Sequence, residues 1–294
     1  MSDPSRKAGH REARRLALVL GGGGSKGALQ VGLYKAVWEL GVRPDLIVGT
    51  SVGALNGAFI AAEVDPTTLA AGWSELSRRR LFGLNWQLLW RGLRAPSVFS
   101  SSRFLHFLRD RLPVSRFEDL PIPLSLITTH LGAGEACLWE RGSLPQAVVA
   151  SCSVPGILPP VEGHDGIPHV DGSLADNLPI DIALDLGATH VIAMNCRTCD
   201  RCTPRIDDLV GVVGAAFSVA ADCKLRLMAD KYSNAPNILL LQPEIGELIR
   251  ALDFSHGRRL VQEGYEYAFP RLKDRLAEWE GDSLPTIRPG ASRV

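Results

Sequence analysis

The chain has 294 residues, of which 46% are hydrophobic and 22% are charged, and its 32 basic residues balance its 32 acidic ones. This composition excludes a disordered chain, a collagen-like repeat and a coiled coil, and the length suits one large domain or two small ones. Because the formal net charge is zero, no overall field draws the protein to nucleic acid, so we expect no nucleic-acid partner.

The N-terminal segment is polar and basic, and only five apolar residues, Leu16 to Leu20, follow it before a run of glycines. A secretory signal needs about 7–15 apolar residues. The longest other apolar run, Leu209 to Ala221, is shorter than the roughly 18 residues of a membrane span. We therefore expect a cytoplasmic protein, with export by a route without a cleaved signal left open. We assign residues 1–14 to a flexible arm, 15–280 to one folded domain and 281–294 to a flexible tail.

Five continuous apolar segments predict the strands of a buried sheet. They are residues 16–20, 46–49, 124–129, 190–194 and 238–241. Because these segments are apolar on both faces, we expect a mainly parallel sheet between two layers of helices. Helical patterns cover residues 25–40, 52–62, 67–80, 101–111, 145–151, 179–186, 206–231 and 257–279. This alternation predicts a three-layer α/β/α fold.

A glycine-rich loop follows the first predicted strand. Its sequence is Gly21-Gly22-Gly23-Gly24-Ser25-Lys26-Gly27. Glycine permits positive φ and close backbone approach, so several amides can point at one anion or oxyanion. The spacing also matches the G-x-G-x-x-G dinucleotide fingerprint, which requires an acidic residue at the end of the second strand. Asp45 precedes that strand instead, but a nucleotide-binding module without catalysis stays as the rival class.

Ser51 lies directly after the second predicted strand, in Gly49-Thr50-Ser51-Val52-Gly53. This is the G-x-S-x-G pattern of a nucleophile elbow, in which a sharp strand-to-helix turn exposes the serine. The small residues Gly49 and Gly53 let the turn close, and the helix expected over 52–62 would favour an alkoxide at its N-terminus. Ser51 is the candidate nucleophile; the alternative is a glycine-rich turn with an inert serine.

A nucleophilic serine needs a base, and Asp171 is the candidate. It stands in Asp171-Gly172-Ser173, where the glycine can present a carboxylate at a loop apex with little hindrance. The alternative is an ordinary Asp-Gly turn with a solvated carboxylate.

In their order and spacing, these motifs resemble the patatin-like phospholipase family. The glycine loop with Lys26 comes first, the G-x-S-x-G elbow follows one βαβ unit later, and the D-G-small motif lies well downstream. Two further stretches are similar to the family: Ala150–Gly156 with Pro159-Pro160-Val161, and Asn177-x-Pro179. The resemblance covers about residues 15–275, and Ser173 departs from the Gly or Ala that is commoner in the family.

The resemblance implies a serine lipid acyl hydrolase with a Ser–Asp dyad and no metal or cofactor. Ser51 would attack the acyl carbonyl, and Asp171 would accept the serine proton and later activate water. The amides of Gly22, Gly23 and Gly24 would hold the oxyanion. The substrates would be carboxylic esters of phospholipids or lysophospholipids. A thioesterase or small-ester hydrolase with the same dyad is the alternative.

A histidine-dependent triad would need one of the chain's histidines as the base. His190 and His256 have the right chain order for an α/β-hydrolase, but that fold places its oxyanion loop after several strands rather than after the first. We expect His190 to stand at the end of a strand, His256 at the start of a helix, and His169 to pack or face solvent.

Residues 78–94 combine large apolar side chains with positive charges alone. The charged residues are Arg78, Arg79, Arg80, Arg91 and Arg94. A helix of this composition suits an anionic lipid surface, with tryptophan at the headgroup level and arginine on phosphates. The alternative is a core helix with arginines at its ends.

Cys196, Cys199 and Cys202 are spaced so that their thiolates could converge on one metal ion. A fourth ligand is missing nearby. We therefore expect a reduced surface loop after a buried strand, and no metal.

Overall fold

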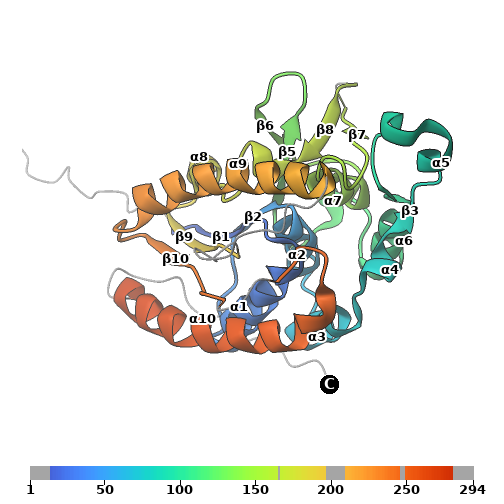
Figure 1. The fold of residues 1–294 in the computed structure, drawn as a ribbon. Coiled ribbons are helices and arrows are strands. Elements are labelled where there is room, and N and C mark those ends of the chain that lie inside the picture. Colours follow the sequence, from blue (N-terminus) through green and yellow to red (C-terminus); the bar gives the residue numbers. More distant parts are fainter. Residues whose placement is uncertain (1–13, 165, 197–208, 246–248, 281–294) are drawn as a thin grey trace, which may run out of the picture.

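The computed structural model describes residues 14–164, 166–196, 209–245 and 249–280. Its centre is an eight-stranded sheet in the order β10-β9-β1-β2-β5-β8-β7, with β6 paired to β5 (Figure 1). The strands are β1 (Leu16–Leu20), β2 (Leu46–Thr50), β5 (Leu124–His130), β6 (Ala136–Trp139), β7 (Val161–Glu162), β8 (Pro168–Asp171), β9 (His190–Met194) and β10 (Ile238–Leu241). The run from β10 to β5 is parallel throughout, and its members are the five predicted strands.

The other edge of the sheet is antiparallel and was not predicted. β6 and β8 both pair with β5 in the antiparallel sense, and β7 pairs with β8. β8 has the sequence PHVD, so it lacks the continuous apolar run by which the parallel strands are recognised. This strand nevertheless matters most for the site, because it ends at Asp171.

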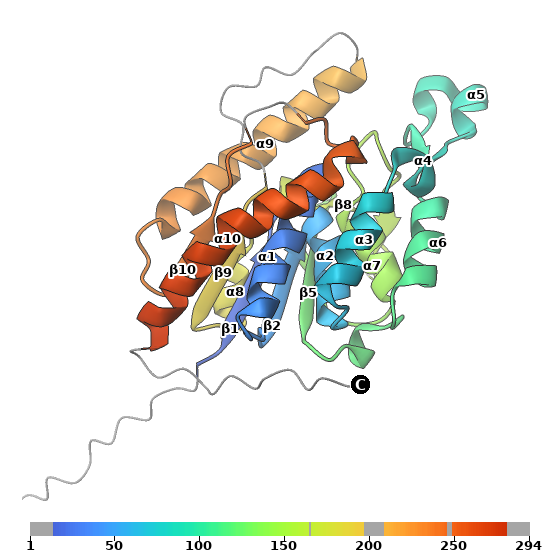
Figure 2. The same ribbon diagram turned by 90° about the horizontal axis from the view of Figure 1, so that it is seen from below.

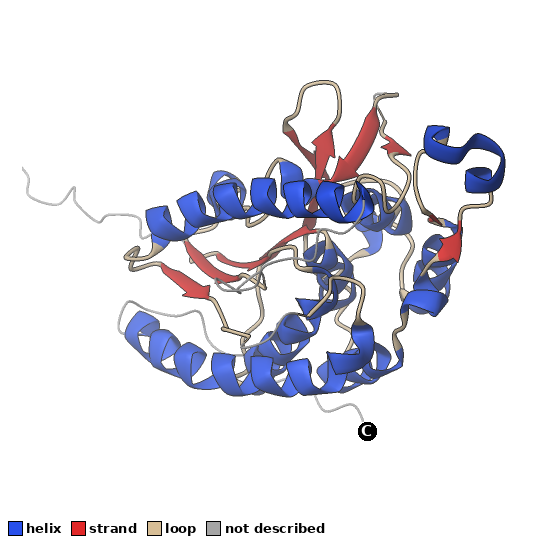
Figure 3. Ribbon diagram, viewed as in Figure 1, coloured by secondary structure: helices blue, strands red, loops and turns tan. Residues whose placement is uncertain are grey.

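Helices cover both faces of the sheet, as Figures 2 and 3 show. One face carries α1 (Ala28–Glu39), α2 (Val52–Ala61), α3 (Pro66–Glu75), α6 (Ser102–Arg111), α7 (Leu144–Ser151) and α10 (Gly257–Glu280). The other face carries α8 (Ile180–Asp185) and α9 (Leu209–Tyr232).

The side chains of β1 show how one strand supplies two cores. Leu18 and Leu20 belong to the core beneath α1, α2 and α10, whereas Ala17 and Val19 belong to the core beneath α8 and α9. Successive side chains of a strand point to opposite faces, so a strand that is apolar throughout stabilises both layers. The predicted three-layer α/β/α fold is confirmed.

The prediction of one continuous helix over residues 78–94 is wrong. The chain forms α4 (Arg78–Leu81), β3 (Gly83–Leu84), α5 (Gln87–Arg91) and a 3₁₀ turn (Gly92–Arg94). β3 pairs with β4 (Phe99–Ser100), and Asn85 is bonded through its amide to Val98 O at 3.0 Å and through Nδ2 to Ser97 O at 3.0 Å. These hydrogen bonds between two segments of the chain hold residues 83–85 in an extended conformation, which is incompatible with one continuous helix.

No helix among the described residues is long and apolar enough to span a membrane. Residues 1–13 of the expected arm and all of the expected tail, 281–294, lie outside the described residues, as do Cys199 and Cys202.

Candidate active site

Ser51 occupies the sharp bend between β2 and α2. Its backbone has φ 55° and ψ −122°, a region that costs a non-glycine residue about 1–3 kcal/mol and is kept only where the surroundings enforce it. The neighbouring Gly53 is one such constraint, because any Cβ there would overlap the carbonyl oxygen of Leu20 in β1. The bend therefore has the backbone geometry of a nucleophile elbow.

The Ser51 hydroxyl donates a hydrogen bond of 2.6 Å directly to Asp171 Oδ2, across 120 residues of sequence. The Asp171 side chain lies in the interior with 0% exposure, and Ser51 is 8% exposed. A short bond to a carboxylate in such surroundings is among the stronger hydrogen bonds in proteins. The alternative of a solvated Asp-Gly turn is wrong for Asp171.

Asp171 is held by bonds to both its backbone and its side chain. The register of β8 pairs it with Thr128 of β5, and its amide donates to Ser153 O at 2.9 Å. The second carboxylate oxygen, Oδ1, accepts from the Ser173 amide at 2.8 Å. One oxygen is thus anchored to the turn while the other faces Ser51.

Ser151 and Cys152, at the end of α7, hold the Ser51 backbone. The Ser51 amide donates to Ser151 Oγ at 2.9 Å, and Ser151 Oγ donates in turn to Ile127 O at 2.6 Å. The Cys152 thiol donates to Ser51 O at 3.1 Å. Burial, together with the negative charge of Asp171, raises the pKa of Cys152 well above its usual value, so this thiol stays protonated and can keep donating. The sequence indicated this stretch only through the family resemblance.

The glycine loop runs beside Ser51: a Cβ on Gly22 would lie 3.2 Å from Ser51 Cβ. The Gly22 amide already donates to the side-chain and backbone oxygens of Asn177, at 3.1 and 3.3 Å. The amides of Gly23 and Gly24, in contrast, donate to no acceptor among the described residues. Of the three glycines named from the sequence, these two are the ones whose amides remain for a ligand.

A chain of buried polar side chains fixes both ends of the glycine loop. Gln30 donates through Nε2 to Gly21 O at 2.7 Å, and Asn56 donates through Nδ2 to Gly27 O at 2.9 Å and to the Gln30 side chain at 2.8 Å. Trp73 completes the chain by donating to Asn56 Oδ1 at 2.9 Å. Sequence reasoning missed this network, although polar residues inside the apolar helical stretches of α1 and α2 were a readable signal.

The histidines stand where the sequence placed them. His169 is buried, shares a hydrogen bond of 2.8 Å with Thr128 Oγ1 and packs edge-on against Trp139. His190 opens β9, and His256 ends a short 3₁₀ segment at the start of α10. The hydroxyl of Ser51 is bonded to Asp171 and to no histidine among the described residues.

Cys196 is a buried residue beneath the glycine loop, and a Cβ on Gly23 would come within 2.8 Å of its Cβ. Burial raises its pKa to about 12, so the thiol is protonated at neutral pH in its present surroundings. The structure therefore describes one member of the Cys196/Cys199/Cys202 set, packed as an uncharged core residue.

Comparison with known proteins confirms the family resemblance. The model of the patatin-like phospholipase family matches residues 18–184. The chain belongs to the patatin-like phospholipase family. Neuropathy target esterase sws of Drosophila melanogaster is 36% identical over 202 residues, which is 68% of this chain and 14% of that protein. Patatin-like phospholipase domain-containing protein 7 of Mus musculus is 36% identical over 206 residues, 68% of this chain and 15% of that protein.

The chain thus spans about one seventh of the length of these curated relatives. Among solved structures, VipD from Legionella pneumophila aligns with a TM-score of 0.49 and 15% identity, covering 89% of this chain and 67% of that one. The ExoU–SpcU complex from Pseudomonas aeruginosa aligns with a TM-score of 0.42 and 16% identity, covering 90% of this chain and 53% of that one.

Proposed function

We propose that this protein is a serine acyl hydrolase that cleaves carboxylic ester bonds of phospholipids or lysophospholipids through a dyad of Ser51 and Asp171. The observation that carries the proposal is the 2.6 Å bond between the Ser51 hydroxyl and the Asp171 carboxylate at a strained elbow. Family membership supports lipid esters as the substrate class, since the relatives are named as an esterase and as phospholipase-domain proteins.

In the acylation step, Ser51 Oγ attacks the ester carbonyl carbon as its proton passes to Asp171 Oδ2. The carbonyl oxygen becomes an oxyanion, which the amides of Gly23 and Gly24 stabilise; each such donor is typically worth about 3 kcal/mol. The positive end of the α2 dipole adds to this field. The tetrahedral intermediate then collapses, the ester C–O bond breaks, and the leaving alkoxide takes the proton from Asp171.

In the deacylation step, Asp171 acts as the general base toward water, as it did toward Ser51 in acylation. It accepts a proton from water while the water oxygen attacks the acyl carbon of acyl-Ser51. Collapse of the second tetrahedral intermediate releases the fatty acid, and the proton on Asp171 returns to Ser51 Oγ. Asp171 accepts and returns the proton in each step of this cycle, so the proposed mechanism requires no metal ion or histidine.

The arginine-rich lobe, residues 78–94, is the part of the proposal that concerns the membrane. Leu84, Trp86 and Trp90 are exposed, and residues 78–94 contain five arginines and no acidic residue. We assign these side chains to contact with an anionic phospholipid surface, tryptophan at the headgroup level and arginine on phosphates.

The segment after the lobe is bonded to the loop that follows Ser153, whose carbonyl oxygen accepts from the Asp171 amide. The Val98 amide donates to Gly156 O and the Phe99 amide donates to Ile157 O, both at 2.9 Å. Figure 1 shows α5 projecting from the body of the protein on this side.

The test is covalent labelling by a fluorophosphonate probe together with a substrate panel. We expect labelling of the native chain and none of Ser51→Ala, with hydrolysis of phospholipids or lysophospholipids that persists in EDTA. Ser173→Ala is the matched control, because it removes a nearby buried hydroxyl but leaves Ser51 in place. Retained labelling of Ser51→Ala would assign the nucleophile elsewhere. Turnover of acyl-CoA or small esters without turnover of any lipid ester would favour the thioesterase or small-ester alternative.

A further inference from the structure

Asn177 is a buried side chain that the proposed mechanism does not use. It is 0% exposed, and both its side-chain Oδ1 and its backbone oxygen accept from the Gly22 amide, at 3.1 and 3.3 Å. A Cβ on Gly22 would lie 2.5 Å from Asn177 Oδ1 and 3.2 Å from Ser51 Cβ. Asn177 therefore contacts the glycine loop at a residue that lies against the nucleophile.

Two anchor points delimit the part of the loop that an oxyanion would use. At one of them the Gly22 amide is bonded to Asn177, and at the other the Ser25 amide donates to Ala251 O at 2.7 Å. Between them lie the two glycines whose amides donate to no acceptor among the described residues. The directions of these two amides therefore depend on where the anchors hold the ends of the span.

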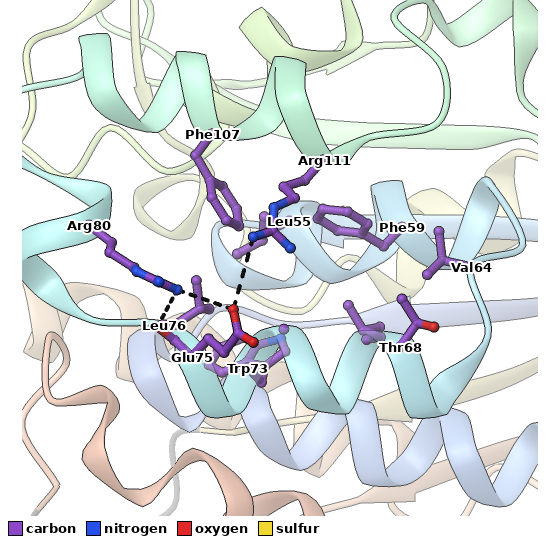
Figure 4. Close-up of a pocket in the computed structure, with 12 residues that line it drawn as sticks. Leu55, Phe59, Val64, Thr68, Trp73, Glu75, Leu76, Arg80, Phe107 and Arg111 are labelled. Carbon is purple, nitrogen blue, oxygen red and sulfur yellow. Dashed lines mark hydrogen bonds and ion pairs between the residues drawn. The ribbon is translucent and has the colours of Figure 1, made fainter.

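A different set of side chains holds the loop through its carbonyl oxygens. Trp73, which Figure 4 shows on α3, donates to Asn56. Asn56 donates in turn to Gly27 O and to the Gln30 side chain, and Gln30 donates to Gly21 O. In the described part of the chain, these side chains accept from no amide of the loop. This network alone therefore does not direct the oxyanion donors.

The segment that carries Asn177 is itself fixed to the elbow. The hydroxyl of Thr50, which directly precedes Ser51, donates to Asp176 O at 3.0 Å. The same segment carries the base, because Asp171 lies only six residues before Asn177. It thus contacts the nucleophile near one end and the glycine loop at the other, and it sets the position of the loop relative to the nucleophile.

The nitrogen of the Asn177 side chain is left without a partner. Nδ2 is buried and forms no hydrogen bond among the described residues. A buried donor without an acceptor destabilises the folded state, so stability alone does not account for an asparagine at this position. Departures of this kind from the rules of stability concentrate at functional sites. The bond that Oδ1 accepts from Gly22 is the contact that accounts for this side chain.

We propose that Asn177 is a positioning residue of the oxyanion site. By accepting from the Gly22 amide, it holds the amides of the next two glycines in the directions that an oxyanion requires. The inference rests on the proposed hydrolysis and adds a residue that acts through the loop rather than on the substrate. Preorganised donors stabilise the transition state because they need not reorient during the reaction. Loss of the anchor should therefore lower kcat more than it raises KM.

The first test measures the loop without any turnover, as hydrogen exchange at the Gly22 amide followed by NMR in the full chain. Asn177→Ala removes Oδ1 and should speed this exchange about tenfold or more. Asn177→Asp keeps an acceptor oxygen at the same place and should leave the exchange slow. Asn237→Ala is the matched control, because Asn237 Nδ2 donates to Thr189 O at the amino end of β10. Thermal unfolding verifies that each variant is folded.

The second test compares a soluble short-chain ester with its thionoester, in which sulfur replaces the carbonyl oxygen and accepts hydrogen bonds weakly. Asn177→Ala should lower kcat for the ester about tenfold, with KM changed less than about threefold. The loss for the thionoester should be much smaller, because that substrate gains little from the amides of the loop. A general disruption of the site would lower both rates alike. Asn237→Ala should change neither.

Three outcomes would overturn the inference. They are unchanged Gly22 exchange in Asn177→Ala, exchange in Asn177→Asp that is as fast as in Asn177→Ala, and equal losses of kcat on the ester and the thionoester. Absence of ester hydrolysis by the native chain would instead refute the proposed function and the catalytic part of this inference. The exchange measurement would still decide whether Asn177 fixes the loop.

Discussion

The corner of the protein that contains Ser51 and Asp171 is buried, whereas the lobe that contains Trp86 and Trp90 is exposed to solvent. Ser51 and Asp171 are 8% and 0% exposed, whereas Trp86 and Trp90 are 72% and 88% exposed. The corner is fixed by hydrogen bonds from β5, α7 and β8, and its strain is supported by close packing. The lobe is attached through the two-residue strands β3 and β4. It exposes apolar side chains, and soluble proteins usually bury contiguous apolar patches.

This contrast separates what a substitution should change in each region. In the corner, a lost bond leaves a buried group without its partner, so both the chemistry and the stability should suffer. In the lobe, removing an exposed ring should change contact with lipid and little else. The contrast would be wrong if substitutions in the lobe reduced catalysis or stability as substitutions in the corner do, or if substitutions in the corner had no effect on either.

The largest expected effect is that of Asp171→Asn. The amide matches the carboxylate in shape but cannot accept the Ser51 proton, so kcat on a soluble short-chain ester should fall by about 10³–10⁴-fold. Asp176→Asn is the control, because Asp176 is also buried but accepts from the Leu178 amide instead of from Ser51. A loss of less than tenfold in Asp171→Asn, with the fold intact, would exclude Asp171 as the base.

Gly53→Ala should be the most destabilising single substitution in the corner. Its methyl group would overlap the carbonyl oxygen of Leu20, and the overpacking should lower the free energy of unfolding by about 3 kcal/mol. Urea unfolding measures this change. Gly57→Ala, on the same helix, would meet only side-chain methyl groups, of which those of Ile47 and Leu124 are the nearest, at 3.3 Å; because side chains can shift where the Leu20 backbone cannot, it should change stability far less than Gly53→Ala. Equal midpoints for the two variants would contradict the close-packing argument.

Ser151→Ala should have a smaller effect of both kinds. It removes the acceptor of the Ser51 amide and the donor to Ile127 O, so we expect a loss of about 1–3 kcal/mol in stability and about tenfold in kcat. Ser153→Ala is closely matched, since Ser153 is equally buried but its hydroxyl donates to Val149 O within α7. An equal loss of kcat in both variants would show that the hydrogen bond from the Ser51 amide to Ser151 is not the cause of the loss.

The double substitution Trp86→Ala with Trp90→Ala should leave the corner intact. We expect binding to vesicles that contain anionic phospholipid to fall about tenfold or more, with hydrolysis of a soluble ester unchanged. The arginine contribution should appear as a further loss of vesicle binding with rising salt, because exposed charges are screened.

Trp38→Ala is the control for this measurement. Trp38 is 48% exposed on α1 and packs against Tyr34, at a distance in sequence from the arginine-rich lobe. Vesicle binding that is unaffected by the lobe substitutions, or that is lost equally in Trp38→Ala, would remove the lobe from the proposed membrane contact.

The strands of the parallel sheet, their alternation with helices along the chain and the position of Ser51 could be predicted from the sequence alone. Continuous apolar segments predict strands that are buried on both faces. The elbow motif spans only five residues, and the sharp turn between β2 and α2 needs a glycine two residues before and two residues after the serine, so the motif locates Ser51. These are local relations, in which neighbouring residues dictate each other's conformation.

The partners of Ser51 were decided only by the tertiary structure. Its bonds to Asp171 and Ser151 cross 120 and 100 residues, and the bond that occupies the Gly22 amide crosses 155. Each depends on the register of a strand or the end of a helix against a distant element, which no local pattern encodes. The break in residues 78–94 has the same cause, because Gly83 and Asn85 bond to the segment around Ser97–Ser100 rather than along a helix.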